Sequence, residues 1–317
     1  MTQELTHSQA SAPIDGQSDF IEDLESLTPT VLASYSRIED ERLRELVTSA
    51  IAHLHAYVKE VNLTNAEWRQ ALDFFNALGR NAGPKSNPAM ALSDLLGVST
   101  LVCLLEDTAT TGGALHTASS VLGPVWREGA PFVESGGSLL RSETPGAPLF
   151  FTGRVLDPSG NPLPDVTVHV WQATPDGLYE NQDDEQEEMN LRARFTTDAD
   201  GTFQFRSVLP GGYPIPDREP LGSMLRLAKR PAWRPAHIHF MLHREGLRTL
   251  VTQIFHPLDP HLHQDAAFGA TRDLMMGGFE EHTGPAPEPG IEGTWYTAEE
   301  TFVMVPGESI VPAAPIE

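Results

Sequence analysis

The sequence predicts a mostly β protein, in which an α-helical region precedes a β-sandwich. Between residues 40 and 110, apolar side chains recur at three- and four-residue intervals, which is the period of amphipathic helices. After residue 110 the chain changes to short β-rich runs that are separated by turn signals, the pattern of a sandwich. We place the boundary in the small-residue stretch at 108–120. The expected organisation is a disordered tail at 1–24, a helical domain at 25–118 and a β-sandwich at 119–317.

Composition limits the classes of partner. The 317 residues include 44 Asp plus Glu against 21 Lys plus Arg, and the resulting net charge of −23 opposes binding to nucleic acid or to anionic membranes. The single cysteine, Cys103, permits no intramolecular disulfide. The first residues lack a secretory signal, and no apolar run reaches the roughly 20 residues of a membrane span. We therefore expect a soluble cytoplasmic protein whose partner is a small neutral substrate or another protein.

Three helices are expected in the first part of the chain. An apolar stripe runs through residues 40–61. Thr64 and Glu67 form a capping-box signature for a second helix, which should end before Gly83. Pro88 opens a third helix, which we expect to continue without interruption through "AMALSDLLGVSTLVCLLED".

The second part of the chain predicts strands. "LFFTGRVL" and "VTVHVWQA" are two strands joined by a loop, and "TFVMVP" near residue 301 is the last strand. "ARFTTDADGTFQFRSV" predicts a hairpin around residues 198–201, and "HIHFMLHREGLRTLVTQIF" predicts another around residues 244–246.

The segment "RPAHIHF" carries the chemistry that is most specific. In an extended chain His237 and His239 point to the same face, which suits two ligands of one metal ion, although histidines in strands are more often ordinary half-buried residues. Tyr179 in "PDGLYENQ" and Tyr213 in "LPGGYPIP" stand in loops before this pair. Two phenolates and two imidazoles suit ferric iron, whereas structural zinc favours thiolates that this chain lacks. Each tyrosine alone could equally be a turn aromatic.

The order of these segments resembles the catalytic domain of the intradiol ring-cleavage dioxygenases over roughly residues 120–270. The helical part resembles the dimerisation region of the same family. The resemblance implies that Tyr179, Tyr213, His237 and His239 are the ligands of Fe(III), and that Arg234 and Gln253 lie beside the substrate. It also implies that Tyr213 leaves the metal to accept a proton from the diol, and that Arg234 stabilises carbanion-like charge on the ring.

The segment "SSVLGPVW" at 119–126 resembles the "TVLGPF" segment of hydroxyquinol 1,2-dioxygenases, and Asp94 matches an aspartate in the pocket of that subgroup. The resemblance thus implies cleavage of hydroxyquinol to a hydroxymuconate or maleylacetate. Val125 and Ala267 are smaller than the subgroup's usual residues, so catechol or a substituted catechol stays an alternative substrate. The residues expected to line the pocket are Asp94, Leu122, Gly123, Pro124, Val125, Ile215, Pro216 and Ala267.

The sequence leaves open a second metal site and a non-enzymatic role. "HPLDPHLHQD" offers His256, His261, His263 and Asp265, which on composition could form a two-histidine, one-carboxylate ferrous site. A non-enzymatic, acidic β-sandwich module that mediates interactions is the other alternative. The family resemblance implies a homodimer, built by residues 40–61 and their neighbours, and a phospholipid in the helical region.

Overall fold

The computed structural model describes residues 20–111, 115–216, 218–271 and 278–317. Two compact units make up the chain, residues 1–73 and residues 74–317. Most of the expected tail at 1–24 lies outside the described residues. The change from helical to β structure falls close to the expected boundary at 118/119, whereas compactness divides the chain at 73/74. The domain limits expected from the sequence stay a prediction.

The first unit contains helices α1 (Leu24–Tyr35) and α2 (Glu41–Glu60) and the first half of α3 (Asn65–Asn81). α1, which the sequence analysis missed, begins with a capping box between Asp23 and Ser26. Asp40 caps α2 in the same way, by accepting a hydrogen bond from the Leu43 amide. The predicted helix over 40–61 and the predicted capping box before α3 are both confirmed.

The predicted third helix is interrupted and bent. α4 (Pro88–Leu95) and α5 (Val98–Thr111) meet at an angle of 71°. Gly97 lies between them with φ of +70°, in the left-handed region that glycine adopts without steric cost. No single helix within the described ranges is long and apolar enough to span a membrane; only the bent pair passes that test, when its two helices are counted together.

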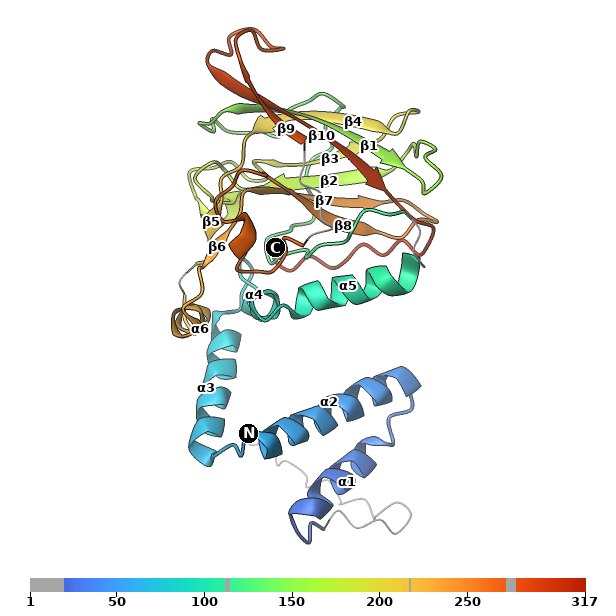
Figure 1. Cartoon of the computed structure of the whole chain (residues 1–317), viewed down its shortest axis with the longest axis vertical. Coiled ribbons are helices and arrows are strands. Elements are labelled where there is room, and N and C mark those ends of the chain that lie inside the picture. Colours follow the sequence, from blue (N-terminus) through green and yellow to red (C-terminus); the bar gives the residue numbers. More distant parts are fainter. Residues whose placement is uncertain (1–19, 112–114, 217, 272–277) are drawn as a thin grey trace, which may run out of the picture. The chain divides into compact units, whose positions relative to one another are not determined.

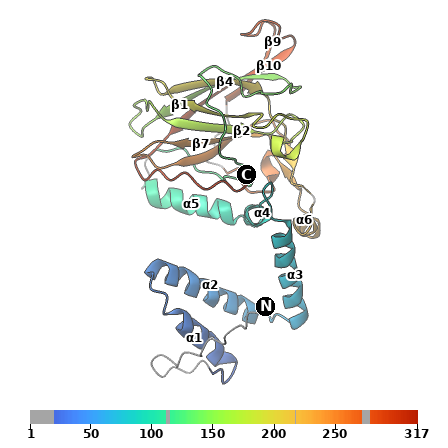
Figure 2. The same cartoon turned by 180° about the vertical axis from the view of Figure 1, so that it is seen from behind.

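The second unit is a sandwich of two sheets, which confirms the predicted fold class. Figure 1 shows the sheets as two layers, and Figure 2 shows them from behind. The strand orders are β4-β1-β10-β9 and β3-β2-β7-β8, and β5 and β6 form a separate ribbon. The strands are β1 (Pro148–Leu156), β2 (Thr167–Gln172), β3 (Arg192–Thr196), β4 (Thr202–Val208), β5 (Tyr213–Pro214), β6 (Trp233–Arg234), β7 (His237–His243), β8 (Leu250–Phe255), β9 (Gly278–Thr283) and β10 (Thr294–Val303). Helix α6 (Leu221–Ala228) and the short 3-10 helices η2 (Glu180–Gln182) and η3 (Leu262–Gln264) lie in the connections.

Aromatic side chains fill the space between the sheets. The ring centroids of Phe151 and Phe205 lie 4.7 Å apart, and those of Phe240 and Phe302 lie 4.9 Å apart. Because strand side chains alternate, Ile238 and Phe240 of β7 point into this core while His237 and His239 point to the outer face of the same sheet. The sheet therefore presents both histidines on one side, supported from behind by a close-packed core.

One of the two predicted hairpins is wrong and the other is confirmed. β3 pairs with β2, and β4 pairs with β1, so the turn at residues 198–201 carries the chain from one sheet to the other. The turn itself is present, because Asp198 accepts backbone hydrogen bonds from Asp200 and Thr202. β7 and β8 do form the predicted antiparallel hairpin, and Gly246 in its turn has φ of +81°.

Candidate active site

The two histidines of β7 converge as the sequence predicts. Their Nε2 atoms lie 3.1 Å apart, and the residues are 1% and 0% exposed. His237 Nδ1 lies 2.6 Å from the carbonyl oxygen of Pro235 and donates its proton to it, so the lone pair is on Nε2. The ring of His239 stacks on Trp171 at 4.7 Å. Burial, followed by the charge of Arg234, lowers the pKa of His237 to about 3, so its lone pair stays available at neutral pH.

Both predicted tyrosines come to the same place. Tyr179 precedes η2 and Tyr213 begins β5, and their hydroxyl oxygens lie 3.4 Å apart. The ring centroid of Tyr213 is 5.6 Å from that of His237, so the pair of phenols lies next to the pair of imidazoles. Gly177 permits this approach, because a Cβ at that position would lie 2.4 Å from the Cβ of Tyr213. Burial raises the pKa of Tyr179 well above its ordinary value, so without a neighbouring cation the phenol keeps its proton.

The separation within each pair of donors suits ligands of a common metal ion. Ligand atoms bound to a common ion at about 2.0–2.1 Å lie roughly 2.9–3.4 Å from each other in octahedral or tetrahedral arrangements. The separations of the two Nε2 atoms and of the two hydroxyl oxygens, 3.1 and 3.4 Å, fall in that interval. Two phenol oxygens and two imidazoles without a thiolate suit a hard trivalent cation such as Fe(III).

A buried ion pair supports Tyr179, and sequence reasoning missed it. Arg192 Nε donates to Glu180 Oε2 at 2.6 Å, and both side chains are 1% exposed. The Arg192 guanidinium also lies 5.6 Å from the centroid of the Tyr179 ring. Glu180 follows Tyr179 directly in the chain, so the ion pair holds the backbone from which the phenol projects. The sequence shows that Glu180 follows Tyr179, but it does not show that the partner of Glu180 is Arg192, which lies on β3.

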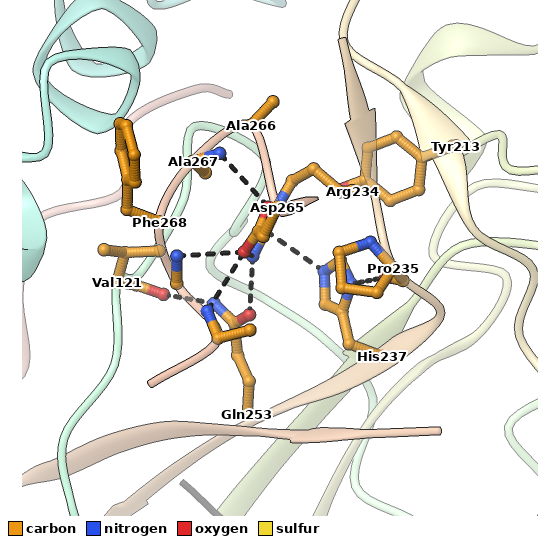
Figure 3. Close-up of polar contacts among 12 residues, drawn as sticks. Val121, Tyr213, Arg234, Pro235, His237, Gln253, Asp265, Ala266, Ala267 and Phe268 are labelled. Atoms are coloured by element: carbon orange, nitrogen blue, oxygen red, sulfur yellow. Dashed lines mark hydrogen bonds and ion pairs between the residues drawn. The ribbon is translucent and has the colours of Figure 1, made fainter. Parts of the chain in front are cut away.

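Arg234 and Gln253, which the family resemblance places beside the substrate, contact each other, and Arg234 also lies next to His237 (Figure 3). Arg234 Nη2 donates to Gln253 Oε1 at 2.8 Å, and Arg234 Nη1 lies 3.2 Å from His237 Nε2. Gln253 is anchored in turn, because its Nε2 donates to the carbonyl oxygen of Val121 at 2.7 Å. Burial would lower the pKa of Arg234, but the Asp265 carboxylate, Tyr213 and Tyr179 together outweigh it and the pKa is raised. Arg234 is therefore a permanent, oriented cation next to the donor set.

Several expected pocket residues surround this set. Gly123 has φ of +74°, and a Cβ at that position would lie 3.5 Å from His239 Cε1. Leu122 and Val125 pack in the cluster that contains both tyrosines, and Ala267 is buried in the loop after η3. Ile215 packs instead against the apolar cluster that includes Leu95 and Ala266. Pro124 is half-buried and Pro216 is exposed.

Asp94 is a buried carboxylate close to this centre. It is 4% exposed, and its Oδ1 has no hydrogen-bond partner among the described residues. Burial raises its pKa, and Ser99 and the charge of Arg234 oppose that rise. Arg234 and Asp265 thus lie within electrostatic range of Asp94, which stands in the last turn of α4. An unpartnered buried acceptor of this kind calls for a donor.

The alternative ferrous site is wrong. The ring of His256 contacts that of Phe279 at 5.2 Å, His261 stacks on Trp233 at 4.5 Å, and His263 is exposed. Asp265 pairs with Arg234 instead of facing a histidine cluster. Across the ranges that the structure describes, no three His, Cys, Asp or Glu side chains are placed to hold a metal. The three histidines diverge because the loop that carries them folds around two turns.

Comparison with known proteins identifies the family. The family model described as "Dioxygenase" matches residues 121–297, and "Catechol dioxygenase N terminus" matches residues 40–113. The chain belongs to the intradiol ring-cleavage dioxygenase family. Hydroxyquinol 1,2-dioxygenase of Nocardioides simplex is 36% identical over 93% of this chain and 99% of that relative. Hydroxyquinol 1,2-dioxygenase of Rhodococcus opacus is 37% identical over 88% of this chain and 93% of that relative.

Solved structures of the family show the same fold. The crystal structure of hydroxyquinol 1,2-dioxygenase from Pseudomonas putida has a TM-score of 0.78 and 34% identity, over 90% of this chain and 99% of that one. Catechol 1,2-dioxygenase from Pseudomonas arvilla has a TM-score of 0.79 and 28% identity, over 94% and 96% of the two chains. Membership of an enzyme family across most of the chain removes the non-enzymatic module as an alternative.

Proposed function

We propose that this intradiol dioxygenase cleaves hydroxyquinol with O2 at an Fe(III) ion held by Tyr179, Tyr213, His237 and His239, and that it yields a hydroxymuconate or maleylacetate. The convergence of two phenols and two imidazoles beside a buried guanidinium carries the proposal. The names of the relatives that are 36–37% identical over most of the chain support the choice of substrate.

The side chains divide the chemistry among them. Fe(III), when held by these four side chains, would supply a Lewis acid to which the two adjacent hydroxyls of the diol could bind and which would make its ring more reactive toward O2. Tyr213 is the less buried of the two phenols, and as an ionised phenolate its oxygen would accept one proton from the incoming diol. Arg234 places its positive charge beside the ring and stabilises negative charge on the attacked carbon. The apolar walls exclude water, which strengthens this electrostatic effect.

Asp94 supplies the selectivity in this proposal. Its unpartnered Oδ1 would accept a hydrogen bond from the third hydroxyl of hydroxyquinol, a donor that catechol lacks. Leaving such a buried acceptor unpaired costs about 1–3 kcal/mol, or roughly 5- to 150-fold in rate. The test is kcat/KM for hydroxyquinol, catechol and 4-methylcatechol, measured by oxygen uptake on wild type and on Asp94→Ala. A wild type that prefers catechol, or an unchanged ratio in the variant, would refute the assignment of hydroxyquinol.

Catechol or a bulkier substituted catechol is the second candidate substrate. Two observations favour it. Val125 and Ala267 have short side chains, and Gly123, whose Cα faces His239, has no side chain at all. The resulting space suits a ring substituent larger than a hydroxyl. In the same assay, 4-methylcatechol turned over faster than hydroxyquinol would support this candidate.

We also propose that the chain forms a homodimer through its helical region. α2 carries large apolar side chains that are about half exposed in one chain: Leu43, Leu46, Leu54 and Tyr57. Burying such a stripe against a second copy follows from the hydrophobic effect. Light scattering should give about twice the 34.6 kDa mass of one chain, and a monomer mass at micromolar concentration would contradict the dimer.

A phospholipid in the helical region is the last part of this proposal. Within the first unit, α1, α2 and the start of α3 line a mainly apolar groove of about 380 Å³ that also contains Lys59 and His55. Apolar walls suit an acyl chain, and a cation suits a phosphate. Organic extraction of the purified protein followed by mass spectrometry should release a phospholipid in stoichiometric amount, and an extract without lipid would refute the idea.

A further inference from the structure

We propose that Asp265 is the positioning residue of the active site, because it orients the Arg234 guanidinium so that only one of its edges faces the substrate. This inference rests on the proposed function, in which Arg234 stabilises charge on the diol. Asp265 pairs with Arg234, and within the described residues it belongs to no cluster that could hold a metal.

The Asp265 carboxylate is held from two sides (Figure 3). Arg234 donates to it through Nε at 3.1 Å and through Nη2 at 3.3 Å, which is the bidentate arrangement of a strong ion pair. Three backbone amides of its own loop donate to the same carboxylate, from Ala267, Gly269 and Ala270, at 2.9–3.1 Å. Burial would raise the pKa of Asp265, but the charge of Arg234 together with the hydrogen bonds from Arg234 and Ala267 outweighs it, and the pKa is lowered. Asp265 is therefore an ionised carboxylate that is hydrogen-bonded on both of its oxygens.

Most of the N–H groups of the Arg234 guanidinium are used by Asp265 and Gln253, and those of Nη1 are left. A guanidinium has five N–H groups. Nε–H is committed to Asp265, and the two N–H groups of Nη2 are committed to Asp265 and Gln253. Nη1 has a single described contact, the lone pair of His237 Nε2 at 3.2 Å. A metal ion that takes this lone pair frees Nη1, and the Nη1 edge then becomes the part of the guanidinium that faces the diol.

Asp265 also prevents a competing ion pair. Asp94 is a second buried carboxylate within electrostatic range of Arg234, and its Oδ1 lacks a partner. Without Asp265, the buried Asp94 carboxylate would attract the guanidinium away from its position, because a buried charge is stabilised by an opposite charge. Asp265 thus keeps Arg234 directed at the ring and leaves Asp94 free for the third hydroxyl.

Asparagine is the informative replacement at this position. Its amide keeps the shape of the carboxylate but offers one acceptor oxygen, and its NH₂ group would face the donors on Arg234 Nη2, Gly269 and Ala270. Asp107→Asn is the matched control, because Asp107 and Asp265 are both 7% exposed. Asp107 also pairs with an arginine, Arg248, and accepts from the Ser119 amide, and neither of these partners is among the proposed iron ligands or their neighbours Arg234 and Gln253.

The kinetic test separates positioning from folding. The iron-loaded variants are compared by kcat for the diol and by the Kd of the diol under anaerobic conditions, followed through the visible spectrum. We expect Asp265→Asn to lower kcat by about 10- to 100-fold with less than a threefold change in Kd, because a misplaced group near the reacting atoms loses rate by such factors. Asp107→Asn should leave both values within twofold of wild type. If Asp265→Asn keeps its kcat, or loses no more than Asp107→Asn, the positioning role is overturned.

A second variant and an NMR measurement distinguish a positioning role of Asp265 from a role in folding. If Asp265→Asn does not fold, Asp265→Glu replaces it: the charge stays but moves by one methylene, and kcat should still fall about 10-fold at unchanged Kd. In the metal-free protein, NMR of the Arg234 guanidinium, assigned with Arg234→Lys, should show a slowly exchanging Nη2–H signal that exchanges faster in Asp265→Asn and is kept in Asp107→Asn. A wild type that binds no iron or cleaves no diol refutes the proposed function, whereas an active wild type with an indifferent Asp265 refutes only this inference.

Discussion

Gly269→Ala should misplace Arg234 without removing any polar group. Gly269 follows Asp265 by four residues, and a Cβ built on it would lie 2.8 Å from Arg234 Nη2 and 3.1 Å from Asp265 Oδ2. Its φ lies outside the left-handed region, so the effect of alanine is steric. The guanidinium cannot simply swing away, because Nη2 is held by Gln253 and Asp265.

The size of the effect follows from these distances. Ordinary van der Waals contact begins at 3.4 Å, so the Nη2 atom or the loop must shift by 3.4 − 2.8 = 0.6 Å. A misplacement of about 1 Å can cost roughly 100-fold in rate, so we expect kcat to fall about 10-fold, which corresponds to about 1.4 kcal/mol of activation free energy. The four proposed iron ligands are not touched by this substitution.

The assay is oxygen uptake with saturating hydroxyquinol, together with the visible spectrum of the iron-loaded protein. Gly79→Ala is the control, because Gly79 lies in α3 and has no heavy atom within 4 Å of its built Cβ. This control should keep full activity and gain roughly 0.5–1 kcal/mol of stability from its better helix propensity. A Gly269→Ala enzyme with the wild-type kcat, an unchanged spectrum and an unchanged Tm would refute the argument that the position of Arg234 limits the rate.

Three more predictions follow from the same structure. Tyr213→Phe should abolish turnover and shift the visible band, since one phenolate ligand is lost; an unchanged spectrum would show that Tyr213 is not a ligand. Dialysis against an iron chelator should remove colour and activity together, and iron added back in air should restore both. Burial, followed by the charges of His243 and Arg194, lowers the pKa of His169 from 6.5 to about 4. Between pH 4 and pH 6.5, His169 therefore binds a proton in the unfolded chain but not in the folded chain. The free energy of unfolding should therefore fall by up to about 3 kcal/mol as the pH drops from 6.5 to 4, and urea titrations of His169→Gln should show a shallower fall than wild type.

The sequence predicted the site better than it predicted strand pairing. Strand alternation places His237 and His239 on one face whatever the partner strands are, so this part of the site follows from local geometry. The turn at 198–201 was also local and correct, but whether its flanking strands pair with each other depends on contacts across the sandwich. The bend at Gly97 was missed because an apolar helical pattern continues through it.

Residues that act through distant partners escaped the sequence analysis. Asp265 stood out only as a possible metal ligand, because its partner Arg234 lies 31 positions earlier in the chain. Glu180 and Arg192 are separated by η2 and a loop, and nothing in their spacing marks an ion pair under Tyr179. Such pairs form when β strands and loops are brought together by the whole fold, and a single sequence carries no local signal for them.

The most direct measurement for the central claim is an anomalous difference map at the iron absorption edge from crystals of the purified protein. The account predicts one strong peak within about 2.0–2.3 Å of the oxygens of Tyr179 and Tyr213 and of the Nε2 atoms of His237 and His239. A map without an iron peak, or with iron bound away from any of these four atoms, would contradict it.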